Sequence, residues 1–138
     1  MTTTGGGTNL QRPLILVVDD MAETRRLMRR VLERDGMRVI EAETGEAAVR
    51  SAARDRPALI VLDLRLPGMS GFDVARRIRA MPDHDLASTP ILACSASVQA
   101  EVRREALDAG CDAFEGKPFD IATFADRIRG LIPRVAAG

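Results

Sequence analysis

The chain has 138 residues, a length typical of one domain, and its 46% hydrophobic content is enough for a single buried core. Lys and Arg total 20, Asp and Glu total 20, and the formal net charge of zero provides no bias toward nucleic acid or an anionic membrane. The apolar runs are far shorter than the roughly 20 residues of a membrane-spanning helix. We therefore expect a cytoplasmic protein with no membrane insertion and no direct nucleic-acid contact.

The first segment of the chain, MTTTGGGTNLQR, is rich in threonine and glycine and has no apolar period. We expect a flexible tail over 1–12, one domain over 13–132 and a C-terminal tail over 133–138. Within the domain, short aliphatic runs alternate with amphipathic stretches, which indicates strands followed by helices. The runs that predict strands are 14–18 (LILVV), 38–42 (RVIEA), 58–62 (ALIVL), 90–94 (PILAC) and 113–115 (AFE).

The stretches after these runs show the three- and four-residue spacing of apolar side chains that predicts helices. The first predicted helix ends before Gly36, and the last covers 121–132 and ends where Pro133 follows. Further helices are predicted over 46–54, 71–80 and 98–109. The only histidine, His84, is expected in a polar loop.

Five repeats of strand then helix predict an α/β fold, because neighbouring parallel strands need crossover connections that cover both sheet faces. The continuous aliphatic runs suit central strands, whereas the charged run 38–42 suits an edge. We expect a doubly wound, five-stranded parallel sheet of order 2-1-3-4-5, the flavodoxin-like arrangement, with helices on both faces.

Polar side chains follow four of the predicted strands at one edge of this sheet, where open parallel sheets bind ligands. They are Asp19, Asp20, Asp63, Ser95 and Lys117, the last being the only lysine of the chain. Three converging carboxylates repel one another unless a hard cation lies among them, and oxygen ligands suit Mg²⁺. The sequence therefore predicts a magnesium site at this edge.

These residue types also predict individual roles in phosphoryl chemistry. Asp19 and Asp20 would hold the metal, and Asp63 would be the nucleophile that attacks phosphorus. Lys117 would neutralise charge on Asp63 and on the phosphoryl oxygens, and Ser95 would donate a hydrogen bond to one of those oxygens.

Four motifs occur in order between Pro13 and Ile132: VVDD, LIVLDLRLPGMSG, CSA and GCDAFEGKPF. With them the chain resembles a response-regulator receiver domain of bacterial two-component signalling, in the single-domain form of chemotaxis regulators. The resemblance implies that Asp63 takes a phosphoryl group from a sensor histidine kinase or a histidine phosphotransfer protein. It implies no enzyme beyond the domain's own phosphorylation and dephosphorylation, and it leaves the downstream protein target unknown.

The resemblance further implies that Mg²⁺ binds Asp19, Asp20, Asp63 and the backbone carbonyl of Arg65. It also implies a cis peptide bond between Lys117 and Pro118, since proline is the usual host of such bonds.

A switch is implied as well, in which Ser95 moves toward the phosphoryl group and the ring of Phe114 rotates into the space it leaves. The surface formed by 98–109, 113–115 and 121–132 would then change for partner binding, and a phosphorylation-linked dimer through it stays open. Serine replaces the frequent threonine at Ser95, and phenylalanine replaces the common tyrosine at Phe114. Arg65 places a long cation at the mouth of the site, where we expect it to alter phosphoryl lifetime.

Other interpretations were weighed against this one. Asp20 could cap the following helix, and the two cysteines, Cys94 and Cys111, are interpreted as free thiols, with Cys94 buried. A receiver-like scaffold that never takes phosphate is the main alternative function. An aspartate-nucleophile phosphatase of the haloacid dehalogenase type would need an aspartate where Arg65 stands. A flavin or nucleotide binder would need a glycine-rich loop where VVDDMAETRR stands.

Overall fold

The computed structural model describes residues 12–133, so the predicted tails lie outside the described residues except for Arg12 and Pro133. Five strands form one parallel sheet of order β2-β1-β3-β4-β5, which confirms the predicted fold class and order. The strands are β1 (Leu14–Val18), β2 (Arg38–Ala42), β3 (Leu59–Asp63), β4 (Ile91–Ser95) and β5 (Ala113–Gly116). The helices are α2 (Ala22–Arg34), α3 (Gly45–Asp55), α4 (Gly71–Arg79), α5 (His84–Ala87), α6 (Ala100–Ala109) and α7 (Ile121–Leu131).

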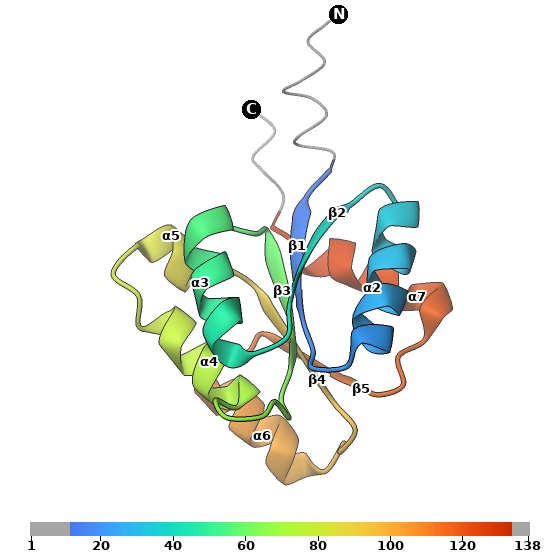
Figure 1. Ribbon diagram of the computed structural model, residues 1–138. Coiled ribbons are helices and arrows are strands. Elements are labelled where there is room, and N and C mark those ends of the chain that lie inside the picture. Colours follow the sequence, from blue (N-terminus) through green and yellow to red (C-terminus); the bar gives the residue numbers. More distant parts are fainter. Residues whose placement is uncertain (1–11, 134–138) are drawn as a thin grey trace, which may run out of the picture.

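Helices cover both faces of the sheet, with α2 and α7 on one face and α3, α4 and α6 on the other (Figure 1). The alternation of side chains along each strand supplies both cores. In β1, Leu16 and Val18 pack toward α3 and α4, whereas Ile15 and Val17 pack toward α2 and α7. All five residues of β3 and of β4 are buried, as continuous aliphatic runs predict for central strands.

Several boundaries differ from the sequence prediction. The polar loop expected around His84 contains a short helix, α5, because the Asp83 carboxylate accepts hydrogen bonds from the N–H groups of Asp85 and Leu86. The helix expected to begin at residue 98 begins at Ala100. Strands β3 and β4 each extend one residue further than expected and include Asp63 and Ser95 as their last residues.

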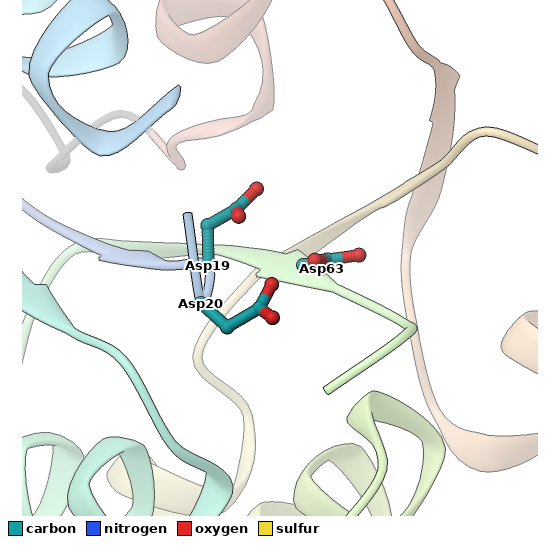
Figure 2. A group of neighbouring side chains, drawn as sticks. All are labelled: Asp19, Asp20 and Asp63. Carbon is teal, nitrogen blue, oxygen red and sulfur yellow. The ribbon is translucent and has the colours of Figure 1, made fainter. Parts of the chain in front are cut away.

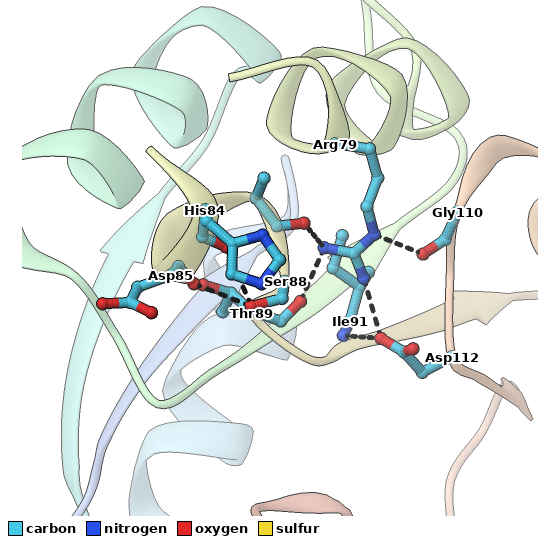
Figure 3. A network of polar contacts seen from close by, with 9 residues as sticks. Arg79, His84, Asp85, Ser88, Thr89, Ile91, Gly110 and Asp112 are labelled. Atoms are coloured by element: carbon cyan, nitrogen blue, oxygen red, sulfur yellow. Dashed lines mark hydrogen bonds and ion pairs between the residues drawn. The ribbon is translucent and has the colours of Figure 1, made fainter. Parts of the chain in front are cut away.

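Arg79, the last residue of α4, ties together the segments that lead into β4 and β5 (Figure 3). Its guanidinium donates to the backbone carbonyls of Ala87, Thr89 and Gly110 at 2.7, 2.8 and 2.9 Å, and to the Asp112 carboxylate at 2.8 Å. Asp112 also accepts from the N–H of Ile91 at 2.8 Å. One side chain thus links the ends of α4, α5 and α6 to the start of β4.

Among the helices of residues 12–133, none combines the length and the apolar character that crossing a bilayer requires. Cys94 and Cys111 are buried free thiols, as interpreted from the sequence for Cys94. Burial raises the pKa of Cys94 to about 12, so this thiol stays protonated and unreactive at neutral pH.

Candidate metal centre

The register of the sheet brings the three predicted acids together at its carboxyl edge. Val18 of β1 pairs with Leu62 of β3, so the next residue along each strand places Asp19 beside Asp63. Asp20 follows directly, and Figure 2 shows the three acidic side chains around the ends of these two strands. One carboxylate oxygen from each residue lies within 4.8 Å of the others.

These acids differ in their contact with solvent. Asp19 is fully buried, with 0% of its surface exposed, and Asp63 is 5% exposed, whereas Asp20 is exposed. Asp20 does not cap α2 as the sequence allowed, because the N-cap residue is Met21 and it makes no side-chain capping hydrogen bond. Its carboxylate is accordingly not used in that structural role.

Lys117 is the counter-charge of the two buried acids. Its Nζ lies 2.7 Å from Asp19 Oδ2 and 3.4 Å from Asp63 Oδ2. Burial lowers the pKa of Lys117, but the hydrogen bond to Asp19 and the charges of both acids outweigh burial, so the pKa is raised overall. The lysine therefore stays charged. The sequence predicted that Lys117 lies near Asp63, but it did not predict the shorter contact with Asp19.

Burial raises the pKa of Asp63, and the backbone hydrogen bond from Arg65 and the charge of Lys117 only partly oppose it. The Arg65 N–H donates to Asp63 Oδ1 at 3.0 Å. On Asp19, the N–H of Met21 donates to Oδ1 at 2.9 Å. Two backbone N–H groups and one ammonium thus orient the two buried carboxylates.

The donor set fits a hard divalent cation. It consists of carboxylate oxygens, each of which has lone pairs beyond those used by its hydrogen bonds, and such oxygens are the ligands of Mg²⁺. The exposed position of Asp20 leaves one side open to the water ligands that Mg²⁺ keeps. Charge favours the same ion, since three acids meet a single ammonium from Lys117.

Ser95 lies next to this cluster, at the end of β4. Asp63 pairs with Cys94, the residue just before Ser95. Ser95 is buried, its hydroxyl accepts from the Ser97 N–H at 3.1 Å, and its carbonyl accepts from the Lys117 N–H at 2.9 Å. The hydroxyl is held by the start of the loop that joins β4 to α6.

Phe114 is apart from the acids, on β5, where its ring is half-buried against the α6 side of the sheet. The guanidinium of Arg103 in α6 lies over the ring, 5.2 Å from its centre. From α7, Arg127 donates to the Phe114 carbonyl at 3.1 Å. The Lys117–Pro118 peptide bond that follows β5 is cis, as the resemblance implied.

Two residues next to the acids were not found by sequence reasoning. Gly71 begins α4, and a Cβ built on it would lie 2.4 Å from the Asp63 carbonyl, so only glycine allows α4 to approach β3 this closely. The motif around Asp63 contains this glycine, but the amino-acid sequence alone does not indicate its close approach to the Asp63 carbonyl. Arg25 donates from Nη1 to the Asp19 carbonyl at 2.7 Å, and no sequence motif indicates this contact.

Comparison with known proteins agrees with this geometry. The family described as response regulator receiver domain matches residues 15–129. Among curated proteins, the transcriptional regulatory protein KdpE of Mycobacterium tuberculosis is 38% identical over 124 residues, which cover 90% of this chain and 53% of that protein. The transcriptional regulatory protein ResD of Bacillus subtilis is 37% identical over 122 residues, 88% of this chain and 49% of that protein. The chain thus spans about half the length of these relatives.

Solved structures share the fold over almost their whole length. The chemotaxis protein CheY4 of Vibrio cholerae has a TM-score of 0.82 and 26% identity, over 88% of this chain and 99% of that one. The receiver domain of the sensor histidine kinase PA1611 from Pseudomonas aeruginosa has a TM-score of 0.79 and 32% identity, over 87% of this chain and 97% of that one. That structure is described with a magnesium ion coordinated in its active-site cleft.

Proposed function

This chain belongs to the response regulator receiver domain family, and from that premise we propose that it accepts a phosphoryl group on Asp63. The single observation that carries the proposal is the convergence of Asp19, Asp20, Asp63 and Lys117 at one edge of the sheet. A purely structural role would not explain why two buried acids and an exposed one meet with a single ammonium.

In the proposed reaction, a carboxylate oxygen of Asp63 forms a bond to phosphorus while the P–N bond of a phosphohistidine breaks. The electron pair of that bond returns to the imidazole of the donor, which takes up a proton, and Asp63 becomes an acyl phosphate. Lys117 holds its charge beside the transferred oxygens, and its salt bridge with Asp63 keeps the nucleophile oriented. Ser95 donates its hydroxyl to one of those oxygens.

Asp19, Asp20 and Asp63 would hold Mg²⁺ together with the backbone carbonyl of Arg65. When bound, the ion would neutralise charge on the phosphoryl oxygens. The arrangement of the carboxylates supports the first three ligands, and the Arg65 N–H on Asp63 keeps this turn next to the site.

Phosphorylation would be transmitted through Ser95 and Phe114 to the surface of α6, β5 and α7. The hydroxyl of Ser95 would leave the Ser97 N–H for the phosphoryl group, which pulls on the loop before α6. Phe114 would rotate inward, away from the guanidinium of Arg103. Its half-buried position supports this step, because a fully packed ring would have nowhere to move.

The partners of this reaction would be proteins. A sensor histidine kinase or a histidine phosphotransfer protein would donate the phosphoryl group in the cytoplasm, and the switched surface would contact a downstream protein, with a dimer of the phosphorylated chain as one form. The domain would catalyse only its own phosphorylation and dephosphorylation.

Intact-mass spectrometry after incubation with acetyl phosphate tests the proposal. We expect wild type to gain one phosphoryl mass with Mg²⁺ and to lose that gain with a chelator, and Asp63→Asn to gain none. Asp73→Asn, which removes an exposed acid of α4, is the matched control and should behave as wild type. If wild type gains no mass from acetyl phosphate or from a phosphorylated kinase, the alternative of a phosphorylation-independent scaffold is favoured.

A further inference from the structure

The side chain of Arg25 in α2 connects the acidic site to two other elements. Its Nη1 donates to the Asp19 carbonyl at 2.7 Å, and its Nε donates to Glu41 of β2 at 2.9 Å. A second acid, Glu43, lies 3.7 Å from its remaining nitrogen. Only 12% of the Arg25 side chain is exposed, so its hydrogen bonds to Asp19 and Glu41 are partly shielded from solvent, whereas the Glu43 side chain is 70% exposed.

The carbonyl that Arg25 contacts is that of the peptide unit between Asp19 and Asp20. On the other side of Asp19, its N–H donates to the Ala42 carbonyl at 3.1 Å, which ends the pairing with β2. Val18 is the last residue of β1, so Asp19 and Asp20 lie just past the paired part of this strand. Arg25 therefore fixes the peptide plane from which both acidic side chains extend.

A second arginine holds the carboxylate that orients Arg25. Arg29, one turn further along α2, donates to Glu41 at 2.6 Å and to Glu33 at 2.7 Å. The hydrogen bond with Arg29, followed by that with Arg25, lowers the pKa of Glu41, so this carboxylate is charged at neutral pH. Arg25 and Arg29 thus share Glu41 as a partner, and it is Arg25 that donates to the Asp19 carbonyl.

We propose that Arg25 is a positioning residue for the metal centre, which sets the orientation of Asp19 and Asp20 through the peptide between them. The inference rests on the proposed function, since it concerns the same Mg²⁺ site. Residues that orient metal ligands typically change metal affinity by about 10-fold to 100-fold when they are replaced. We expect the lower end of that range, because Lys117 and the Met21 N–H still hold Asp19 directly.

Electrostatics alone predicts the opposite sign. Removing the cation of Arg25 leaves Glu41 and Glu43 less compensated, and the added negative charge would attract Mg²⁺ more strongly. Removing Arg29 also uncovers the charge of Glu41 without touching Asp19. The direction of the change in affinity therefore separates positioning from charge.

The experiment compares Arg25→Ala, Arg25→Lys and the matched control Arg29→Ala. Free Mn²⁺ is counted by electron paramagnetic resonance during titration of each protein, and Mg²⁺ affinity is obtained by competition. Urea unfolding of each variant, followed by circular dichroism, reports stability separately. We expect Arg25→Ala to bind Mg²⁺ about 10-fold more weakly than wild type, Arg29→Ala to bind no more weakly than wild type, and Arg25→Lys to lie between.

Each outcome bears on one statement. If Arg25→Ala binds as tightly as wild type or more tightly, Arg25 does not position the site. If both alanine variants weaken binding equally and lose equal stability, the role is structural, and the proposal is again overturned. Should Arg25→Ala not fold, Arg25→Lys decides, since it keeps the charge and loses the planar fork. A wild type that binds neither ion contradicts the metal centre itself rather than the role of Arg25.

Discussion

At the scale of single residues, the choice of lysine at position 117 fits its two partners. A compact ammonium reaches the carboxylate of Asp19, just after β1, at 2.7 Å and that of Asp63, at the end of β3, at 3.4 Å, whereas a guanidinium would impose the plane of its fork. The same ammonium cannot neutralise Asp19, Asp20 and Asp63 together. The site therefore keeps an excess of negative charge, which is what a divalent cation needs and what a folded core avoids.

Arg65 offers a test of how the mouth of the site controls the acyl phosphate. Its N–H contacts Asp63 at 3.0 Å, while its side chain is exposed. We expect Arg65→Ala to lose its phosphoryl group faster, because the long cation no longer competes for the oxygens or hinders the attacking water. An exposed charge contact contributes up to about 1 kcal/mol, so hydrolysis should be about three to five times faster.

The decay of the phosphorylated mass at fixed Mg²⁺ measures this rate. Alanine keeps the backbone N–H and carbonyl of residue 65, so metal binding should not change. Arg65→Lys is the matched control, since it preserves the charge and should keep the slow decay. Equal rates for Arg65→Ala and wild type would show that the side chain has no part in phosphoryl lifetime.

At the scale of elements, the carboxyl edge of the sheet holds the acidic site, and the amino end of β4 is held in place by hydrogen bonds. The carboxyl ends of β1 and β3 present the acids, and the loop from β4 to α6 begins at Ser95. The amino end of β4 is held by Arg79, whose guanidinium satisfies carbonyls from α5, from the turn before β4 and from the end of α6 (Figure 3). The carboxyl-terminal end of α6, far from the loop that joins β4 to α6, is thereby anchored.

Replacing this anchor should be costly for the fold. Arg79→Ala leaves the Thr89 carbonyl, on a residue only 6% exposed, and the Gly110 carbonyl without their donor. Hydrogen bonds to charged groups contribute about 1.5 to 3 kcal/mol each and are not additive, so we expect a loss of about 3 kcal/mol in the free energy of unfolding.

Urea unfolding monitored by circular dichroism measures this loss. The control is Arg77→Ala on the same helix, whose exposed side chain should change stability by less than about 0.5 kcal/mol. A loss for Arg79→Ala no larger than that of the control would mean that water replaces the guanidinium at these carbonyls without penalty.

The sequence predicted the helices and strands whose apolar residues repeat at a regular spacing. It did not predict contacts made by long side chains across the fold. Continuous aliphatic runs placed β3 and β4 at the centre, and the strand ends placed Asp19 beside Asp63. The helix α5 spans only four residues, too few for a period to be visible. In α2, Arg25 and Arg29 share a face toward Glu41, but the adjacent pairs 25–26 and 29–30 do not reveal which arginine of each pair contacts an acid of β2.

At the scale of the whole molecule, stability and function compete at the acidic edge. Because burial raises the pKa of Asp63, the folded state binds this proton more tightly than the unfolded chain does. The charged form of Asp63 therefore costs stability: the cost grows as the pH rises from the pKa of the unfolded chain to the raised pKa of the folded state, and it is complete above the raised pKa. The anchored hydrogen bonds and two apolar cores elsewhere in the molecule offset this cost.

A crossover in stability should reveal this competition. In chelator, we expect Asp63→Asn to be more stable than wild type by about 1 kcal/mol, because the amide removes a buried charge from the neighbourhood of Asp19. Mg²⁺ at ten times its dissociation constant should stabilise wild type by about 1.4 kcal/mol through its preference for the folded state. The variant, which lacks one carboxylate ligand, should gain much less, so the order of the two proteins reverses.

Urea midpoints with and without Mg²⁺ for both proteins check the reversal. Asp126→Asn, an exposed acid of α7, is the control and should follow wild type under both conditions. If wild type is the more stable protein in chelator, then Lys117 and the backbone N–H groups fully compensate the buried charge of Asp63. The excess charge of the site would in that case reside on Asp20, where solvent already screens it.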